Sequence, residues 1–317
     1  MSEEETIAKK ILVLGLDNAG KSSILKIVQE KMLDPIQDES PTKGVARSEM
    51  EILGQKIVIH DLGGQRKYKI QYLDNPTYFE KTDVLIFVLD LQDKDRYELA
   101  LDYYEGAMSI LDKLMLFPEL FIFMHKFDGE YEEDYDDINT RVRLEYDHVS
   151  DEFKKIARTH GRSIEYVFQT TIFDEWSCYV AFNAAWTAVV PKLVSMQEFL
   201  DKLGEENEEI SIALLLDEKG SVLAKKLRYH EGIDMENLAD IAARSVMLLL
   251  SWQKTLENEA IDKTDFAILE IEEESVMIQK LNTATEVLYL LIYVIGGDYK
   301  EFQERFKNIA FTLENLL

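Results

Sequence analysis

Apolar residues in the first half of the chain fall in short continuous runs that alternate with segments of helical periodicity. Continuous runs are typical of parallel strands that are buried on both faces of a sheet. We expect such strands over residues 11–14, 84–90, 120–124 and 164–169. We expect helices over residues 23–28, 97–114, 149–160 and 174–190. This alternation predicts an α/β fold with a doubly wound, mostly parallel sheet over residues 1–191.

The pattern changes after Pro191. A helix is expected first, and then two strands whose short connection carries a glycine, as in a hairpin. A long helix, three antiparallel strands and a final helix complete the order. The expected elements cover residues 192–203, 210–216, 221–228, 234–258, 265–271, 275–281 and 286–295, with the last helix ending at residue 316. This order predicts a separate α+β domain over residues 192–317.

The helix expected over residues 234–258 is apolar on most of its circumference. Its central part contains Val246, Leu248, Leu249, Leu250 and Trp252. A helix of this kind is usually buried on more than one side. We expect one side to cover the strands of its own domain and the other to contact a second molecule, so this domain is expected to dimerise. The alternative is a monomer in which the first domain covers the helix.

A phosphate-binding loop is the clearest chemical motif. The segment Gly15-Leu16-Asp17-Asn18-Ala19-Gly20-Lys21-Ser22 lies between an expected strand and an expected helix, which is the context that this motif requires. Its glycines let backbone N–H groups point at phosphate oxygens, and the helix adds its positive N-terminal end. A chance match in a loop is the alternative, which the flanking elements disfavour. The nucleotide-binding residues expected here are Asp17, Asn18, Ala19, Gly20, Lys21, Ser22 and Ser23.

Residues that suit Mg²⁺ and an attacking water follow further along the chain. Lys21 is placed to reach the β- and γ-phosphates, and the Ser22 hydroxyl is placed to ligate Mg²⁺. Asp61 ends an expected strand and can hold the metal through water. Gly64 permits close approach to a γ-phosphate, and Gln65 stands where it could orient a water molecule. The alternative for this segment is an ordinary glycine-rich turn.

The third group of site residues suits a guanine base. The strand expected over residues 120–124 ends in His125-Lys126-Phe127-Asp128. Guanine presents two neighbouring N–H donors, and one carboxylate can accept both, whereas adenine offers no such pair. Asp128 is therefore expected to select the base, and the aliphatic part of Lys126 can lie across the purine.

The composition of the chain narrows the binding partners and the cellular compartment that we expect. The chain of 317 residues has 35 Lys and Arg against 61 Asp and Glu, a net charge of −26. So acidic a surface argues against nucleic-acid binding and against unaided docking on anionic lipid. A single cysteine, Cys178, fits a reducing compartment. Ser2 stands where myristoylation needs glycine, and the last residues offer no prenylation cysteine, so we expect a cytoplasmic protein that reaches membranes only through a partner.

These motifs together resemble the Ras superfamily, nearest its Arf and Rag branches. The resemblance rests on the phosphate loop, Pro41-Thr42, the segment from Asp61 to Gln65, and Lys126 with Asp128. His125 in place of the usual asparagine, and Thr170-Thr171-Ile172-Phe173-Asp174, resemble Rag GTPases in particular, as does a second domain that looks like their roadblock domain. The sequence is thus similar to Rag GTPases over nearly its whole length.

The resemblance implies further site residues. Thr42 would bind Mg²⁺ and sense the γ-phosphate, and Thr171 and Ile172 would approach the guanine O6 through their backbone. The segments around Thr42 and Gln65 would be the two switches that GTP orders. His125 replaces the asparagine that ties the base loop to the phosphate loop in relatives. An arginine finger is not evident, since Arg47 and Arg66 in the switches are expected to be solvated.

The resemblance also implies partners and a role. GTP or GDP and Mg²⁺ would be the ligands of a slow GTP hydrolase. A second Rag-like or roadblock protein would pair with the chain as a homodimer or heterodimer, and a GTPase-activating protein and an effector would bind it. Rag proteins relay nutrient sufficiency to the TOR kinase complex at lysosomal or vacuolar membranes. The main alternative is a scaffold that binds GTP or GDP with negligible hydrolysis; Asp128 disfavours a P-loop ATPase or kinase.

Overall fold

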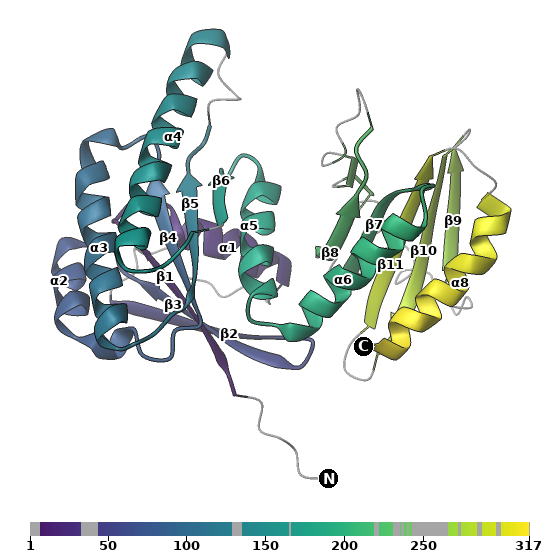
Figure 1. Ribbon diagram of the computed structural model, residues 1–317, viewed down its shortest axis with the longest axis horizontal. Helices are drawn as coiled ribbons and strands as arrows, with labels where there is room; N and C mark the ends of the chain where they lie inside the picture. Colours follow the sequence, from purple (N-terminus) through teal and green to yellow (C-terminus); the bar gives the residue numbers. More distant parts are fainter. Residues whose placement is uncertain are drawn as a thin grey trace. The chain divides into compact units, whose positions relative to one another are not determined.

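The computed structural model describes residues 7–32, 44–128, 135–164, 166–218, 222–230, 235, 238–239, 241–242, 266–271, 274–283, 287–295 and 299–316. The chain forms two compact units, Met1–Val189 and Val190–Leu317. In Figure 1 the first is coloured from purple to teal and the second from green to yellow. The domain boundary expected from the sequence, between residues 191 and 192, falls in the first turn of α6 (Pro191–Glu206).

The first unit is built on a single sheet with the strand order β2-β3-β1-β4-β5-β6. Its strands are β1 (Lys9–Gly15), β2 (Val45–Ile52), β3 (Gln55–Leu62), β4 (Val84–Asp90), β5 (Glu119–His125) and β6 (Tyr166–Thr170). β2 runs antiparallel to β3, and the other neighbours are parallel. The apolar run of β4 is buried along its whole length because helices cover both faces of the sheet. The expected α/β fold is confirmed.

The register of the parallel strands brings their carboxyl ends to one edge. Gly15 at the end of β1 lies opposite Val88 of β4. Asp90 lies opposite His125, and His125 lies opposite Thr170 at the end of β6. Loops that follow these ends meet outside the sheet, where open α/β folds bind ligands. The expected site segments therefore start from neighbouring strands.

Helices cover both faces of this sheet, with α2, α3 and α4 on one side and α1 and α5 on the other (Figure 1). Their bounds are α1 (Lys21–Met32), α2 (Arg66–Asp74), α3 (Tyr97–Lys113), α4 (Tyr135–Thr159) and α5 (Glu175–Thr187). Phe87 of β4, Tyr104 of α3 and Phe153 of α4 form an aromatic cluster with ring centroids 4.9 to 5.4 Å apart. Each such buried ring stabilises the fold by about 1.5–3 kcal/mol, so this cluster fixes both helices on the sheet.

Five of the described helices differ from the sequence expectation; α1 and α6 end four and three residues later than expected. α4 begins at Tyr135 rather than near residue 149, since Ile138 and Val142 extend the helical spacing of apolar residues toward the N-terminus. α5 ends at Thr187 rather than residue 190, because the residue before a proline is driven out of helical geometry. Val190, before Pro191, has extended backbone angles. α2 was not expected because only Lys69 and Tyr72 of its nine residues are buried, which leaves no apolar periodicity.

The second unit contains an antiparallel sheet with the order β8-β7-β11-β10-β9. Its strands are β7 (Ile210–Asp217), β8 (Val222–Leu227), β9 (Phe266–Ile271), β10 (Glu274–Asn282) and β11 (Val287–Ile295). α6 packs on β7 and β8, and α8 (Tyr299–Leu316) packs on β10. The expected strands of this half are confirmed to within one or two residues, because apolar runs and the turn residues between them are local signals in the sequence.

The helix expected over residues 234–258 lies mostly outside the described residues. The described positions within it, residues 235, 238, 239, 241 and 242, are helical. Among the helices that the structure describes, none combines the length and the hydropathy needed to cross a bilayer.

Candidate functional site

Only glycine fits at the two glycine positions of the phosphate-binding loop, because neighbouring atoms leave no room for a Cβ atom. Gly15 has φ +149° and Gly20 has φ +87°, a region in which L side chains are strained. A Cβ atom on Gly15 would lie 2.3 Å from the carbonyl oxygen of Val88, and one on Gly20 would lie 2.2 Å from Cδ2 of His125. The loop then enters α1 at the positive end of the helix dipole. This geometry suits a bound phosphate.

Lys21 is enclosed by the loop. Its side chain is buried, and Nζ donates to the carbonyl oxygens of Gly15 at 3.1 Å and Leu16 at 2.8 Å. Burial lowers the pKa of Lys21, while the negative charges of Asp61 and Asp17 raise it. An ammonium group in this position can donate charge-assisted hydrogen bonds to phosphate oxygens.

The other expected loop residues surround Lys21 in sequence. Asn18 has φ +62° and, like Ser23, is exposed, whereas Ala19 is buried. Positive φ suits Asn better than most residues because its short side chain tolerates the left-handed region. The loop therefore combines an exposed polar turn with a buried cation.

Two oxygen groups that the sequence assigns to Mg²⁺ are in contact. The Ser22 hydroxyl, in the first turn of α1, donates to Oδ2 of Asp61 near the end of β3 at 3.0 Å. Mg²⁺ prefers oxygen ligands of this kind and usually retains several waters, so these residues fit the ion. Thr42, the third expected ligand, lies outside the described residues.

Gly64 lies directly against the phosphate loop. A Cβ atom on Gly64 would be 2.1 Å from the carbonyl carbon of Leu16 and 2.2 Å from the backbone nitrogen of Asp17. Only glycine permits this approach. Gln65 follows at the start of α2, where it is half-buried and makes no side-chain capping hydrogen bond. The side chain of Gln65 therefore does not cap the helix.

A single carbonyl oxygen joins the two segments expected to act as switches. The carbonyl of Gly44, before β2, accepts a hydrogen bond from the N–H of Gly63 at 2.9 Å and another from the hydroxyl of Tyr72 at 2.8 Å. Tyr72 is 1% exposed and belongs to α2. A displacement of the segment before β2 must therefore disturb α2, and the reverse also holds.

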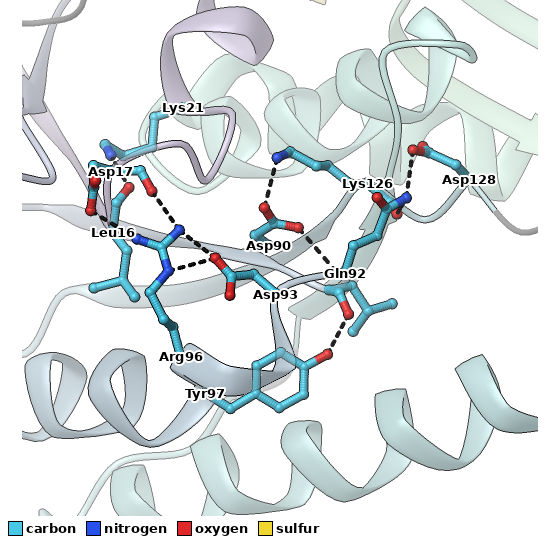
Figure 2. Close-up of polar contacts among 11 residues, drawn as sticks. Leu16, Asp17, Lys21, Asp90, Gln92, Asp93, Arg96, Tyr97, Lys126 and Asp128 are labelled. Atoms are coloured by element: carbon cyan, nitrogen blue, oxygen red, sulfur yellow. Dashed lines mark hydrogen bonds and ion pairs between the residues drawn. The ribbon is translucent and has the colours of Figure 1, made fainter.

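Asp128, the carboxylate expected to select the base, is held on both sides. Oδ1 of Asp128 accepts from the Thr171 hydroxyl at 2.5 Å, and Oδ2 accepts from Nε2 of Gln92 at 2.8 Å. Lys126 donates to Oδ2 of Asp90 at 2.6 Å, as Figure 2 shows together with the contact of Gln92. These contacts fix the orientations of both expected base-binding side chains.

The second strand-end segment places Thr171 and Ile172 beside this carboxylate. The backbone N–H of Thr171 donates to the Ser177 hydroxyl at 3.0 Å, and the Thr171 side chain is buried. Ile172 is 48% exposed. The segment is therefore anchored through Thr171 to α5, with the next residue open to solvent.

His125 connects three parts of the site. The side chain is 1% exposed, its Nδ1 lies 3.0 Å from the hydroxyl oxygen of Thr170, and its ring packs against Gly20. Burial, with a smaller effect of the Lys126 charge, lowers the pKa of His125 to about 4. The neutral ring thus packs the base loop directly against the phosphate loop.

Sequence reasoning missed the segment between β4 and α3. Asp90 and Gln92 contact the base loop, and Arg96, in the short 3₁₀ turn Lys94–Arg96, contacts Asp17 of the phosphate loop (Figure 2). A signal was available, since Asp90 ends a buried parallel strand at the same edge as the other motifs. The partners of Asp90, Gln92 and Arg96 could not be read from the sequence, because each partner lies 36 to 79 positions away along the chain.

The parallel sheet, the phosphate loop and the carboxylate at the base position define a P-loop GTP-binding protein of the Ras superfamily. The conserved region of Gtr1/RagA G proteins matches residues 10–242. The chain therefore belongs to the Gtr1/RagA family, the Rag-type small GTPases near Arf. Proteins of this family bind guanine nucleotides, typically with Mg²⁺, and hydrolyse GTP.

Arf-like proteins are also similar to this chain. ADP-ribosylation factor-like protein 3 of Caenorhabditis elegans is 35% identical over 137 residues, which cover 43% of this chain and 70% of that protein. The protein of the same name from Chlamydomonas reinhardtii is 37% identical over 119 residues, covering 38% of this chain and 63% of that protein. The Trypanosoma brucei Arl6 small GTPase with bound GppNp superposes with a TM-score of 0.42 at 19% identity, covering 57% of this chain and 98% of that one.

From the buried neutral ring of His125 we predict how the stability of the folded chain depends on pH. The unfolded chain binds a proton at this histidine below its ordinary pKa of about 6.5, whereas the folded chain resists protonation down to about 4. Stability is therefore lost as pH falls through this window, by about 3 kcal/mol in total. We expect the free energy of unfolding, measured with urea, to fall by more in the wild type than in His125→Asn as the pH is lowered from 7 to 4.5.

The control is His148→Asn, at an exposed histidine. The difference between its free energy of unfolding and that of the wild type should stay smaller than the difference for His125→Asn across the same pH range. A constant difference between wild type and His125→Asn from pH 7 to 4.5 contradicts this prediction.

Proposed function

We propose that this chain is a GTP-operated switch with slow, Mg²⁺-dependent hydrolysis, which acts as part of a dimer in nutrient signalling of the TOR type. The observation that carries the nucleotide part is the meeting, at one edge of the sheet, of the buried Lys21, the Ser22–Asp61 contact and the doubly hydrogen-bonded Asp128. The role in nutrient signalling follows from the family resemblance alone.

In this proposal each group keeps the role that its chemistry suits. Lys21 and the N–H groups of the phosphate loop bind the β- and γ-phosphates. Asp128 accepts from N1 and N2 of guanine, and the stem of Lys126 covers the ring. Ser22 and Asp61 would hold Mg²⁺, which neutralises charge on the phosphates when bound.

Hydrolysis is assigned to Gln65, which would orient the attacking water beside Gly64. The position is supported by the close contact of Gly64 with the phosphate loop. Intrinsic hydrolysis in this class is slow, about 10⁻⁴ s⁻¹ in Ras, and an activating arginine raises it by about 10³ to 10⁵. The rival function is a nucleotide-gated scaffold with negligible turnover.

A switch also requires that its segments move together. The carbonyl of Gly44 accepts from both Gly63 and Tyr72, so it links the segment after Thr42 to the helix after Gln65. A γ-phosphate that orders one segment would then bias the other. This shared acceptor supports coupled switching.

The second unit is proposed to be a roadblock-like dimerisation domain. Its sheet ends in β8 and β9, and sheet edges pair readily with another chain. The apolar helix expected over residues 234–258 would supply the rest of the interface. We propose a cytoplasmic protein that a scaffold recruits to a lysosomal, vacuolar or other membrane, because the net charge of −26 opposes direct binding to anionic lipid.

Base selection is tested by Asp128→Asn. Losing two charge-assisted hydrogen bonds should weaken GTP binding by about a hundredfold. The new amide donates to the C2 oxygen of xanthine, so xanthosine triphosphate should bind better than it does to wild type. Calorimetric titration with both nucleotides measures this. Asp95→Asn, an exposed acid of the same charge, should behave as wild type; unchanged GTP affinity in Asp128→Asn removes this residue from the site.

Hydrolysis is tested by Gln65→Leu in single-turnover assays with and without cell extract as a source of activator. The variant should retain GTP affinity and lose the stimulated turnover, because leucine cannot orient water. Gln71→Leu, a control on the exposed face of α2, should retain it. Equal stimulated rates in Gln65→Leu and wild type refute the role. A wild type that never exceeds its intrinsic rate favours the scaffold.

Assembly is tested by sedimentation of the full chain with GDP and with GppNp. A dimer is expected in both states, because the proposed interface lies in the second unit. Residues 1–189 alone should sediment as a monomer of the size of one unit. A full chain that remains monomeric at about 50 μM, a concentration at which stable interfaces form dimers, and that recovers no roadblock-domain protein in pull-downs from cell extract contradicts the proposal.

A further inference from the structure

Asp17 places a negative charge inside the phosphate loop. Its side chain is 55% exposed, and its backbone nitrogen lies in the contact with Gly64 described above. The same charge acts on Lys21 and raises the pKa of that lysine. A carboxylate at this position would repel the phosphates and compete with them for Lys21 unless another cation neutralised it.

Arg96 supplies such a cation from a different part of the chain. Its Nη1 donates to Oδ1 of Asp17 at 3.0 Å, and Nη2 donates to the Asp17 carbonyl at 3.2 Å. Its Nε donates to Oδ2 of Asp93 at 2.5 Å (Figure 2). These two carboxylates raise the pKa of Arg96, with the Asp93 hydrogen bond as the main cause. A planar guanidinium can make all three contacts at once, whereas a lysine cannot.

The segment that carries Arg96 is itself fixed. The backbone N–H of Leu91 donates to the carbonyl of His125 at 2.9 Å, and the Tyr97 hydroxyl donates to the Leu91 carbonyl at 2.5 Å. The guanidinium is therefore positioned relative to both the base loop and the phosphate loop. A side chain restrained in this way loses little entropy when it pairs with Asp17.

The charge of Asp17 also acts on a second cation, Lys69 of α2. Lys69 is 6% exposed, and its Nζ lies 5.5 Å from the ring centroid of Tyr103, which is also buried. Burial lowers the pKa of Lys69, and the charge of Asp17 opposes this effect. Asp17 thus interacts electrostatically with cations of two elements, and one of these, α2, follows the proposed water-orienting residue.

We propose that Arg96 is a positioning residue that neutralises Asp17 and thereby sets the preference of the phosphate loop for GTP over GDP. GTP carries one phosphate more than GDP, and its γ-phosphate lies nearer the start of the loop and Gly64 in the proposed binding mode. Loss of Arg96 leaves the Asp17 charge free to repel this group. The inference rests on the proposed nucleotide site and adds the residues that tune its discrimination.

The experiment measures the affinities of the full chain for GDP and for GppNp by calorimetry, with Mg²⁺ present. Arg96→Ala should lower the affinity ratio of GppNp to GDP by about tenfold at low salt, and the loss should shrink at 0.5 M NaCl because Asp17 is partly exposed. Asp17→Asn added to Arg96→Ala should restore the ratio to within about twofold of wild type. Asp17→Asn alone should raise the ratio, since Arg96 is then an uncompensated cation.

Arg96→Lys keeps the charge and should give an intermediate ratio, even if Arg96→Ala folds poorly. Lys155→Ala, which removes one cation from a surface pair with Glu152, is the charge-matched control and should leave the ratio unchanged. An unaltered ratio in folded Arg96→Ala, or in Asp17→Asn alone, overturns the inference, as does failure of the double variant to recover. A wild-type chain that binds neither nucleotide refutes the proposed function instead.

Discussion

The close approach of backbone and side chains at the carboxyl edge of the parallel sheet is the constraint on which the site depends. Gly15 lies against the backbone of β4, Gly20 against the ring of His125, and Gly64 against Leu16. No side chain larger than hydrogen fits at these three glycines, so each contact fixes one loop relative to the next. The phosphate loop, the segment after β3 and the base loop are thereby held together.

Electrostatics then adapts an acidic protein to an anionic ligand. The chain carries a net charge of −26, yet the edge that meets the phosphates contains Lys21, Lys69 and Arg96. Each of them interacts with the charge of Asp17, which is 55% exposed. Salt therefore weakens the pairing of Asp17 with Arg96. The acidity of the remaining surface limits its partners without weakening the site.

The segment between β4 and α3 takes part in both the packing of the loops and the balance of charges at the site. It contacts the base-selecting carboxylate through Gln92 and the phosphate loop through Arg96. On the other side of the loop, the shared carbonyl of Gly44 couples the start of β2 to α2. The site is thus a set of loops joined by hydrogen bonds rather than independent motifs, which is the arrangement that a nucleotide-dependent switch requires.

The sequence by itself determined the parallel sheet, the second antiparallel sheet and the segments that form the site, because apolar runs, glycines and strand-end acids are local signals. The tertiary structure decided what those signals do not contain. α2 has no apolar periodicity and is positioned by two buried side chains, Lys69 and Tyr72. The pairing of Arg96 with Asp17 joins residues 79 positions apart. Such contacts depend on strand order and register, which arise only when the whole sheet has formed.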